Sequence, residues 1–259
     1  MNAAVCIKQV PSGSVPTDAE GNLQRDRGGT RLNPRDEYAL EAALTLARET
    51  GGSVTAITMG PPSAEAVLKT AFALGADRGI LLTDRAFAGA DVYATAYTLS
   101  QGIRALGGFD VIVCGQQSTD GDTAQLPFSL GIQLGIPVLG WVKHYELTEG
   151  RILVHQELSQ GTQQVIAPPP CVLAVGTGCR QLRIPSLGDQ LRARSRKIQV
   201  LALPDLLDSN AAHYGRAASP TRVVGTERIE HPAKNLPAVL SGEATARRIF
   251  RAVQEAGHE

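Results

Sequence analysis

The sequence predicts an α/β fold: a doubly wound parallel sheet with a small antiparallel β addition and an extended C-terminal arm. From residue 1 to residue 135, apolar runs alternate with amphipathic helix patterns. The runs are apolar throughout, which is typical of parallel strands buried on both faces. Apolar residues make up 43% of the chain but aromatic residues only 4%, which favours close helix-on-sheet packing over an aromatic-rich β-sandwich.

Four strands and three helices are expected in this first part. The expected strands are Ala3–Lys8, Ser53–Thr58, Gly79–Thr83 and Asp110–Cys114. A first helix is expected to start at Asn33 as the cap, with Pro34 in the first turn and Asp36 at the positive end of the helix dipole. Ser63–Leu74 and Val92–Leu106 show similar apolar stripes. This alternation predicts right-handed crossovers between parallel strands.

The pattern changes after Gly135. Val138–Leu147 and Arg151–Leu158 flank a Thr-Glu-Gly turn and predict a β-hairpin. Gln163–Ala167 is expected to be another short strand. Cys171–Gly176 is apolar enough to be a buried strand that returns to the main sheet.

The C-terminal third is less regular. Arg180–Lys197 is rich in arginine, and Val200 to Leu236 shows weak periodicity, which predicts an extended arm. Ser241–Ala256 has the pattern of an amphipathic helix. We therefore divide the chain into an α/β domain (residues 1–200) and a C-terminal arm and helix (residues 201–259).

The charge and composition exclude several classes of function. The 25 Lys and Arg residues balance 25 Asp and Glu residues, and this neutrality argues against nucleic-acid binding while favouring association with a protein partner. The chain has no apolar run of roughly 20 residues and no secretory signal pattern. We expect a soluble cytoplasmic protein with no membrane span.

The cysteines and histidines indicate neither a metal site nor a catalytic centre. Cys6, Cys114 and Cys171 lie in apolar strand-like runs and are expected in the core, and Cys179 has no partner at metal-ligand spacing. The serines show no GxSxG elbow. The five histidines are scattered along the chain, so we assign no catalytic residue and no metal ligand.

The most informative segment follows the fourth expected strand. Ligands of open parallel sheets bind at the carboxyl ends of the strands, and here small and polar residues run from Gly115 to Gln125 before a helix. Backbone N–H groups at such a helix start attract phosphate, and Gly115 and Gly121 allow close approach. Thr123 adds a hydroxyl group and Gln125 an amide. The alternative is a strand–loop–helix joint with ordinary capping.

Two acidic residues in this segment oppose a phosphate. Asp120 and Asp122 are therefore expected to cap the helix or hold ribose hydroxyls. The segment matches neither the Walker loop nor GxGxxG. The basic residues Arg192–Lys197 are either a solvated helix face or a docking site for an acidic partner.

Five segments together resemble electron transfer flavoprotein β subunits, in the same order along the chain. They are Cys6–Pro11, Asn33–Leu44, Thr58–Pro62, Gly75–Asp91 and Asp120–Gln125. The resemblance implies the adenine-nucleotide α-hydrolase-like variety of the doubly wound fold. It also implies a heterodimer with an α subunit, an oxidoreductase or flavin dehydrogenase partner, and no separate reaction of this chain alone.

The resemblance also implies a nucleotide site and a partner-binding segment. The nucleotide site maps onto Cys6, Asn33, Asp36, Met59, Gly115, Gln116, Gln117, Ser118, Asp120, Gly121, Asp122, Thr123, Ala124, Gln125 and Leu126. Arg180–Lys197 resembles the family's recognition loop, with Leu187 as the apolar anchor and Arg192 and Arg194 after it.

The family divides by the nucleotide in this site: AMP in one branch, and in the electron-bifurcating branch a FAD that accepts a hydride from NADH. Asp120–Gln125 and Thr83–Asp91 resemble the second branch, which implies FAD, with AMP as the alternative, and places Arg85 and Asp91 near the isoalloxazine. One departure is Pro127–Phe128 where the family tends to have Gly: Pro127 lacks an N–H group and Phe128 adds bulk.

A protein with the same fold could also have a different class of function. A nucleotide-binding regulatory module of the universal-stress-protein kind would have no redox role and would need neither Leu187 nor the basic segment. An adenylating enzyme is the third hypothesis, although the sequence lacks an obvious pyrophosphate-binding signature.

Overall fold

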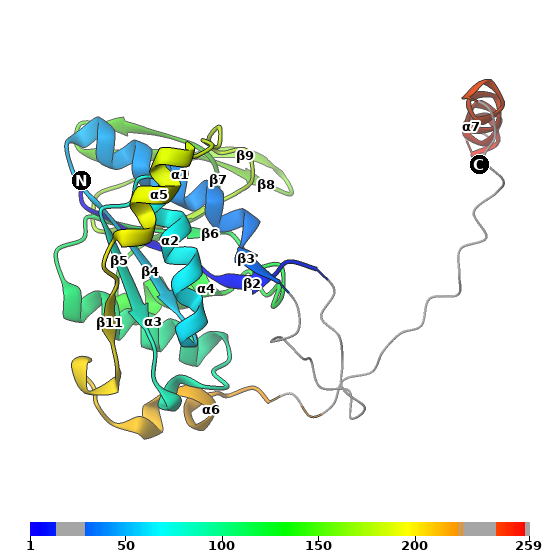
Figure 1. Cartoon of the computed structure of the whole chain (residues 1–259). Helices are drawn as coiled ribbons and strands as arrows, with labels where there is room; N and C mark the ends of the chain where they lie inside the picture. The colour runs from blue at the N-terminus through cyan, green and yellow to red at the C-terminus, as the bar shows by residue number, and fades with distance from the viewer. Residues whose placement is uncertain (14–28, 223, 225–241, 257–259) are drawn as a thin grey trace. The chain divides into compact units, whose positions relative to one another are not determined.

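The computed structural model describes residues 1–13, 29–222, 224 and 242–256, and the chain forms two compact units, Met1–Val224 and Gly225–Glu259 (Figure 1). The first unit is built on one nine-stranded sheet. Its strands, in spatial order, are β11 (Gln199–Leu201), β5 (Arg78–Leu82), β4 (Val54–Met59), β1 (Ala3–Cys6), β6 (Val111–Gly115), β10 (Cys171–Val175), β7 (Val138–Thr148), β8 (Arg151–Leu158) and β9 (Gly161–Ala167). Every pair from β11 to β7 is parallel, and β8 and β9 add an antiparallel edge.

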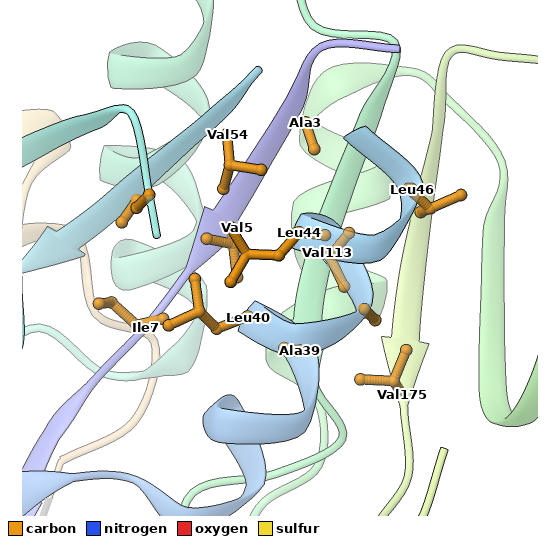
Figure 2. Packing of buried hydrophobic residues seen from close by; sticks show 14 of the residues in the cluster. Ala3, Val5, Ile7, Ala39, Leu40, Leu44, Leu46, Val54, Val113 and Val175 are labelled. Atoms are coloured by element: carbon orange, nitrogen blue, oxygen red, sulfur yellow. The ribbon is translucent and has the colours of Figure 1, made fainter. Parts of the chain in front are cut away.

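Helices cover both faces of the sheet. α1 (Pro34–Thr50) and α2 (Glu65–Leu74) pack on one face, and α3 (Val92–Leu106) and α4 (Leu126–Leu134) on the other. Successive side chains of a strand point to opposite faces. Val5 accordingly packs with Leu40 and Leu44 of α1 (Figure 2), whereas Ala4 and Cys6 pack in the α3–α4 cluster. No helix in the described part of the chain is long and apolar enough to cross a membrane.

The order of the strands reverses at β1. The chain runs outward from β1 to β4 and β5, and α3 then returns it to β6 on the other side of β1. Cys6 at the end of β1 pairs in register with Cys114 of β6. Ligands bind at such a switch point because loops diverge there and leave a crevice.

The predicted elements of the doubly wound sheet are confirmed to within two residues at nearly every boundary. The antiparallel addition is also confirmed as β7, β8 and β9, and Cys171–Val175 does return to the main sheet between β6 and β7. A separate two-stranded sheet, which pairs β2 (Gln9–Pro11) with β3 (Thr30–Leu32), was not predicted. Cys6, Cys114 and Cys171 are buried as expected, and so is Cys179.

The prediction of an extended arm from Val200 onward was wrong for the residues that precede 220. β11 continues the sheet beside β5, and η4 (Leu203–Asp205), η5 (Ala211–His213) and α6 (Gly215–Ala218) follow it. A three-residue strand and single helical turns are too short to show a period in the sequence. The rest of the expected arm lies largely outside the described residues. In the second unit, α7 (Gly242–Ala256) confirms the predicted terminal helix.

Candidate functional site

The site begins where β6 leaves the sheet, directly against the start of α1. At Gly115 a Cβ atom would lie 2.3 Å from Oδ1 of Asp36 and 2.9 Å from the carbonyl carbon of Arg35. A glycine is therefore required for this close approach between strand and helix. We call the segment that follows, residues 116–125, the β6–α4 loop.

Asn33 and Asp36 connect the exits of β1 and β6. The Lys8 N–H donates to Oδ2 of Asp36 at 2.8 Å. Asn33 Nδ2 donates to the Gln117 carbonyl at 3.0 Å, and Asn33 Oδ1 accepts from the Thr119 N–H at 3.3 Å. Asn33 does precede α1, but its side chain makes no capping bond to the helix. Asn33 is thus the N-cap residue as expected, but it makes no side-chain capping bond because its amide holds the β6–α4 loop.

Two buried ionisable side chains, Asp36 and Cys114, lie at the exits of β1 and β6. Burial raises the pKa of Asp36 to about 7, against the opposing effect of hydrogen bonds from Asn33, Lys8 and Gly115. The hydrogen bond with Cys6, together with burial, raises the pKa of Cys114 well above its ordinary value. Because a thiol reacts as its thiolate, this raised pKa disfavours reaction at Cys114.

The backbone of the β6–α4 loop contains two left-handed residues and several free donors. Asp122 and Ala124 have positive φ angles of 48° and 53°. Left-handed residues in a turn direct neighbouring N–H groups to one side, an arrangement that binds anions. Within the described residues, the N–H groups of Thr123, Ala124 and Gln125 find no hydrogen-bond acceptor.

The first turn of α4 also lacks a side-chain cap. Gln125 is the N-cap residue, and no side chain accepts a bond from the helix start. The expectation that Asp120 or Asp122 caps this helix is therefore wrong. The exposed N–H groups leave the positive end of α4 open to an anion.

Each of the two carboxylates of the loop is paired with a nearby side chain. Lys8 Nζ lies 2.7 Å from Oδ1 of Asp120, and Gln117 Nε2 donates to Asp122. Partial burial acts to raise the pKa of Asp120, but the Lys8 ammonium outweighs it and holds the pKa below its ordinary value. Both acidic side chains are thus occupied while the backbone donors remain free.

Lys8 was missed as a site residue. It belongs to the first resembling segment, but its side chain was not singled out. The available signal was its position, since it is a charged residue two positions after β1, the strand at the switch point of the sheet.

The structure brings most of the predicted nucleotide-site residues to one place. Cys6, Asn33, Asp36 and residues 115–126 all lie at the carboxyl ends of β1 and β6. Met59 ends β4, one strand away, and Arg85 and Asp91 follow β5, two strands away. Gln116 lies beside Val175, whose carbonyl accepts its N–H at 3.0 Å.

The two unusual residues after Leu126 are accommodated in α4. Pro127 lies in the first turn, where a missing N–H group leaves no hydrogen bond unmade. The Phe128 ring packs on β7, because a Cβ atom at Gly140 would lie 2.6 Å from it. Part of the bulk of Phe128 is thereby taken up by the sheet.

The loop after β5 is closed by later parts of the chain. Asp91 caps α3 by accepting from the Ala94 N–H at 3.0 Å. Its other oxygen accepts from the N–H of Thr221 at 2.9 Å and from the hydroxyl of Thr221 at 2.7 Å. Arg85 is exposed, and no hydrogen bond or ion pair holds its guanidinium among the described residues.

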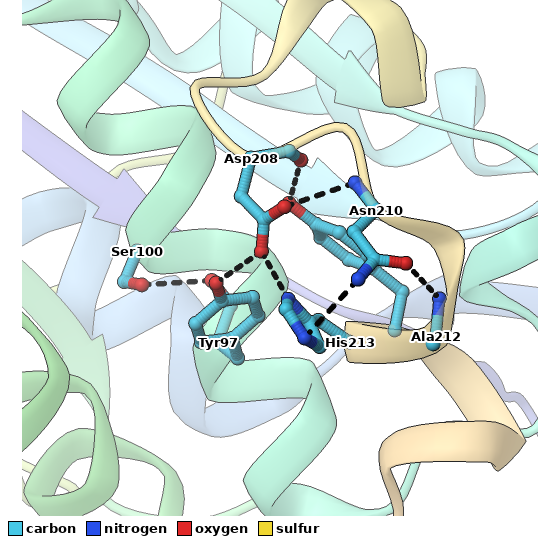
Figure 3. Close-up of polar contacts among 7 residues, drawn as sticks. Tyr97, Ser100, Asp208, Asn210, Ala212 and His213 are labelled. Atoms are coloured by element: carbon cyan, nitrogen blue, oxygen red, sulfur yellow. Dashed lines mark hydrogen bonds and ion pairs between the residues drawn. The ribbon is translucent and has the colours of Figure 1, made fainter.

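A second polar cluster, on α3 and the segment after β11, resembles an acid–base constellation (Figure 3). Asp208 Oδ2 accepts from the Tyr97 hydroxyl at 2.6 Å and lies 2.6 Å from Nδ1 of His213. These bonds lower the pKa of Asp208 to about 2, and burial, aided by Asp208, raises the pKa of Tyr97 to about 12. The Ser100 hydroxyl donates to the Tyr97 carbonyl and, among the described residues, makes no hydrogen bond to His213. The cluster fastens the segment to α3.

The predicted partner-binding segment forms an exposed helix on a firm base. Arg183 forms two bonds of 2.6 Å to Glu41 of α1, and Ser186 starts α5 (Leu187–Ser195) with a capping box. Leu187 is 72% exposed. Arg192 pairs with Asp189 at 2.5 Å, and Arg194 is exposed. The base is fixed, while the apolar and basic side chains point to solvent.

Comparisons with known proteins agree on one family. The model of the electron transfer flavoprotein domain matches residues 21–206. The chain is 39% identical over 228 residues, 87% of each chain, to the electron transfer flavoprotein subunit beta of Thermoanaerobacterium thermosaccharolyticum. It is 36% identical over 245 residues to the caffeyl-CoA reductase-Etf complex subunit CarD of Acetobacterium woodii, covering 93% of this chain and 92% of CarD. It is 34% identical over 250 residues, 93% of each chain, to the acryloyl-CoA reductase electron transfer subunit gamma of Anaerotignum propionicum.

Proposed function

The chain belongs to the electron transfer flavoprotein family as a β subunit, and on that premise we propose that it holds FAD at the exits of β1 and β6. AMP is the alternative nucleotide. In this proposal the chain pairs with an α subunit and passes electrons between a dehydrogenase, or NADH, and an acceptor. The electron-bifurcating version of this role is part of the proposal.

The observation that carries the proposal is the set of free backbone donors in the β6–α4 loop. The free N–H groups of Thr123, Ala124 and Gln125 and the uncapped start of α4 fit a phosphate group. A Cβ atom at Gly121 would have no heavy atom closer than 3.4 Å, which leaves room beside the loop. The residues of the loop therefore fit the negatively charged part of an adenine nucleotide.

The chain's own residues contribute binding and orientation. Bound FAD would supply the electron transfer chemistry that protein side chains lack. The β6–α4 loop would hold the phosphates, and Asn33 and Asp36 would keep that loop against α1. Arg85, which is exposed and unpaired among the described residues, is proposed to lie near the isoalloxazine. Asp91 would fix the loop that carries Arg85.

The sequence resemblance supports FAD over AMP. The segments Asp120–Gln125 and Thr83–Asp91 resemble the bifurcating branch of the family. Two of the relatives are named as parts of CoA reductase systems, one as an Etf complex subunit and one as an electron transfer subunit. Those names belong to the relatives and motivate the proposed electron donor and acceptor here.

We propose Leu187 as the anchor that docks this chain to its redox partner, with Arg192 and Arg194 beside it. An exposed leucine on a fixed helix start can enter an apolar pocket without losing much conformational freedom. The amphipathic helix α7 has exposed apolar residues at Ile249, Phe250 and Val253. We propose that this helix packs on the α subunit.

The main experiment is to purify the chain with the α subunit and to count the flavins and AMP released on denaturation. Two flavins per heterodimer support FAD in this chain. One flavin together with AMP would contradict the FAD version and leave the electron transfer family role intact. A homodimer that binds ATP but no flavin would contradict the whole proposal and support the regulatory module.

The docking proposal needs a matched pair of variants. Leu187→Ala is expected to slow electron transfer to the partner enzyme without changing flavin content. Leu207→Ala is the control, because Leu207 is similarly exposed but lies outside the α5 segment. Equal effects of the two variants would contradict the assignment of Leu187.

A further inference from the structure

Lys8 brings a positive charge to the β6–α4 loop from the end of β1. Its N–H is fixed by Asp36 at 2.8 Å, and its ammonium lies 2.7 Å from Oδ1 of Asp120. The Ser118 hydroxyl lies 3.5 Å from Nζ, at the limit of a hydrogen bond. The Lys8 side chain is nevertheless 45% exposed. An ammonium group has three N–H donors, so at least one donor is left for a ligand.

The charges around the loop require such a cation. Asp120 and Asp122 place two carboxylates in the segment whose free backbone donors are proposed to bind a phosphate. Like charges a few ångströms apart repel, by about 1 kcal/mol at 4 Å even in water. Among the described residues, Lys8 is the basic side chain that contacts this loop. Its charge offsets the repulsion between Asp120 and an incoming phosphate.

We propose that Lys8 binds a phosphate of the nucleotide, and that Asp120 holds the ammonium in position before the ligand arrives. This proposal rests on the proposed nucleotide site. The Cβ position of Gly121 lies 4.0 Å from Lys8 Nζ, so the ammonium borders the open side of the loop. Asp120 also accepts from the Gly121 N–H at 2.8 Å, which keeps its carboxylate in place when Lys8 turns to the phosphate.

A purely structural role makes a different prediction. If the Lys8–Asp120 pair only tethered the loop, removing either partner would weaken nucleotide binding to a similar extent. If Lys8 binds phosphate, the two substitutions act in opposite directions. Lys8→Gln removes the attractive charge, whereas Asp120→Asn removes a repulsive charge and frees the ammonium.

The experiment titrates AMP and FAD, with adenosine as the phosphate-free probe, into the heterodimer after its bound nucleotide has been removed. Calorimetry is expected to show AMP and FAD binding to Lys8→Gln about 10- to 100-fold more weakly, the size of one charge-assisted hydrogen bond. Adenosine binding is expected to change less than about 2-fold. Asp120→Asn is expected to bind AMP several-fold more tightly, with the gain reduced at high salt.

Two further variants provide controls. Lys143→Gln removes a half-exposed lysine that pairs with Glu157 at 2.7 Å on the antiparallel edge, and it should leave all three affinities unchanged. Lys8→Arg keeps the charge and should retain most of the AMP affinity. If Lys8→Gln does not fold, Lys8→Arg and Asp120→Asn still decide whether Lys8 binds phosphate or only tethers the loop.

The outcomes separate this proposal from the one it rests on. If the unmodified heterodimer binds neither AMP nor FAD, the proposed nucleotide site fails, and the role of Lys8 fails with it. If nucleotide binds but Asp120→Asn weakens AMP binding as much as Lys8→Gln does, Lys8 is a tether and this inference is overturned. A loss of adenosine affinity equal to that of AMP would overturn it in the same way.

Discussion

The loops that follow β5 and β6 have similar compositions but different hydrogen-bond partners. Both follow a buried parallel strand, carry two aspartates and glycine, and lead into a helix. After β5, Asp84 accepts from the Leu203 N–H at 3.1 Å and Asp91 accepts from Thr221. After β6, the aspartates pair with Lys8 and Gln117, and no later segment among the described residues supplies acceptors for the free backbone donors.

The difference between the two loops shows when polar residues at the end of a strand indicate a ligand-binding site. The loop after β5 uses its carboxylates to attach the chain that returns beyond β11. The loop after β6 keeps its N–H groups and the start of α4 free. Polar composition at a strand exit is therefore informative only when the rest of the fold leaves the polar groups unpaired.

The largest effect is expected for a substitution at Gly115, where the β6–α4 loop meets the start of α1. Gly115→Ala would place a methyl group 2.3 Å from Asp36 Oδ1 and against the Arg35 backbone. We expect a loss of about 3 kcal/mol in the free energy of unfolding, at the upper end for overpacking, together with loss of nucleotide binding. Urea denaturation measures the first effect and calorimetry the second.

Gly121→Ala is the matched control in the same loop. Its added methyl group would meet Ser118 Oγ at an ordinary 3.4 Å, so the stability should change by less than about 0.5 kcal/mol. Equal losses for both glycine variants would show that the loop, and not its junction with α1, is the rigid part.

The second prediction concerns the buried carboxyl beneath the open loop. Folded Asp36 keeps its proton up to a pKa of about 7, whereas the unfolded carboxyl loses its proton near 3.8. Between these values the folded state binds more protons, so this group makes the protein less stable as pH rises, by about 1.4 kcal/mol per pH unit. Asp36→Asn should remove that slope between pH 5 and pH 7 in urea denaturation. An unchanged slope would show that Asp36 is ionised in the folded state.

The third prediction distinguishes a residue that holds the loop after β5 in place, Asp91, from one that is proposed to lie near the ligand, Arg85. Asp91→Ala removes the cap of α3 and the anchor of Thr221, which should cost about 1 kcal/mol of stability with little direct change in FAD affinity. Arg85→Met should weaken FAD binding with little change in stability, because the Arg85 side chain is exposed and unpaired among the described residues. Thermal unfolding and flavin titration of both variants test this contrast. FAD binding lost in a stable Asp91→Ala would place the Asp91 carboxylate on the ligand.

The smallest effect is expected for the Asp208 cluster, because it is partly exposed. The bonds from Tyr97, Asn210 and His213 lower the pKa of folded Asp208 to about 2. Its contribution to stability is therefore complete above the ordinary pKa of 3.8 and is lost as pH falls toward 2. Asp208→Asn should make the unfolding free energy less sensitive to acid between about pH 4 and pH 2, where the folded and unfolded carboxyl groups differ in protonation. A greater loss of stability in acid for the variant would contradict this sign.

The sequence determined much of the fold because the deciding patterns are local. Continuous apolar runs predicted β1, β4, β5 and β6, and Pro34 marked the first turn of α1 correctly. The β6–α4 loop was identified by its composition and its place after a strand. Resemblance of short segments added the family, which the comparisons confirm.

Which polar groups stay free depends on contacts between segments far apart in the chain. Asn33 looks like a helix cap in the sequence but binds a loop 84 residues away, and Asp120 is neutralised by a lysine 112 residues away. β11 is a strand only because β5 offers it an edge. Local periodicity records the burial pattern of an element, whereas hydrogen-bond partners depend on which segments the fold brings together, and that information is distributed over the whole chain.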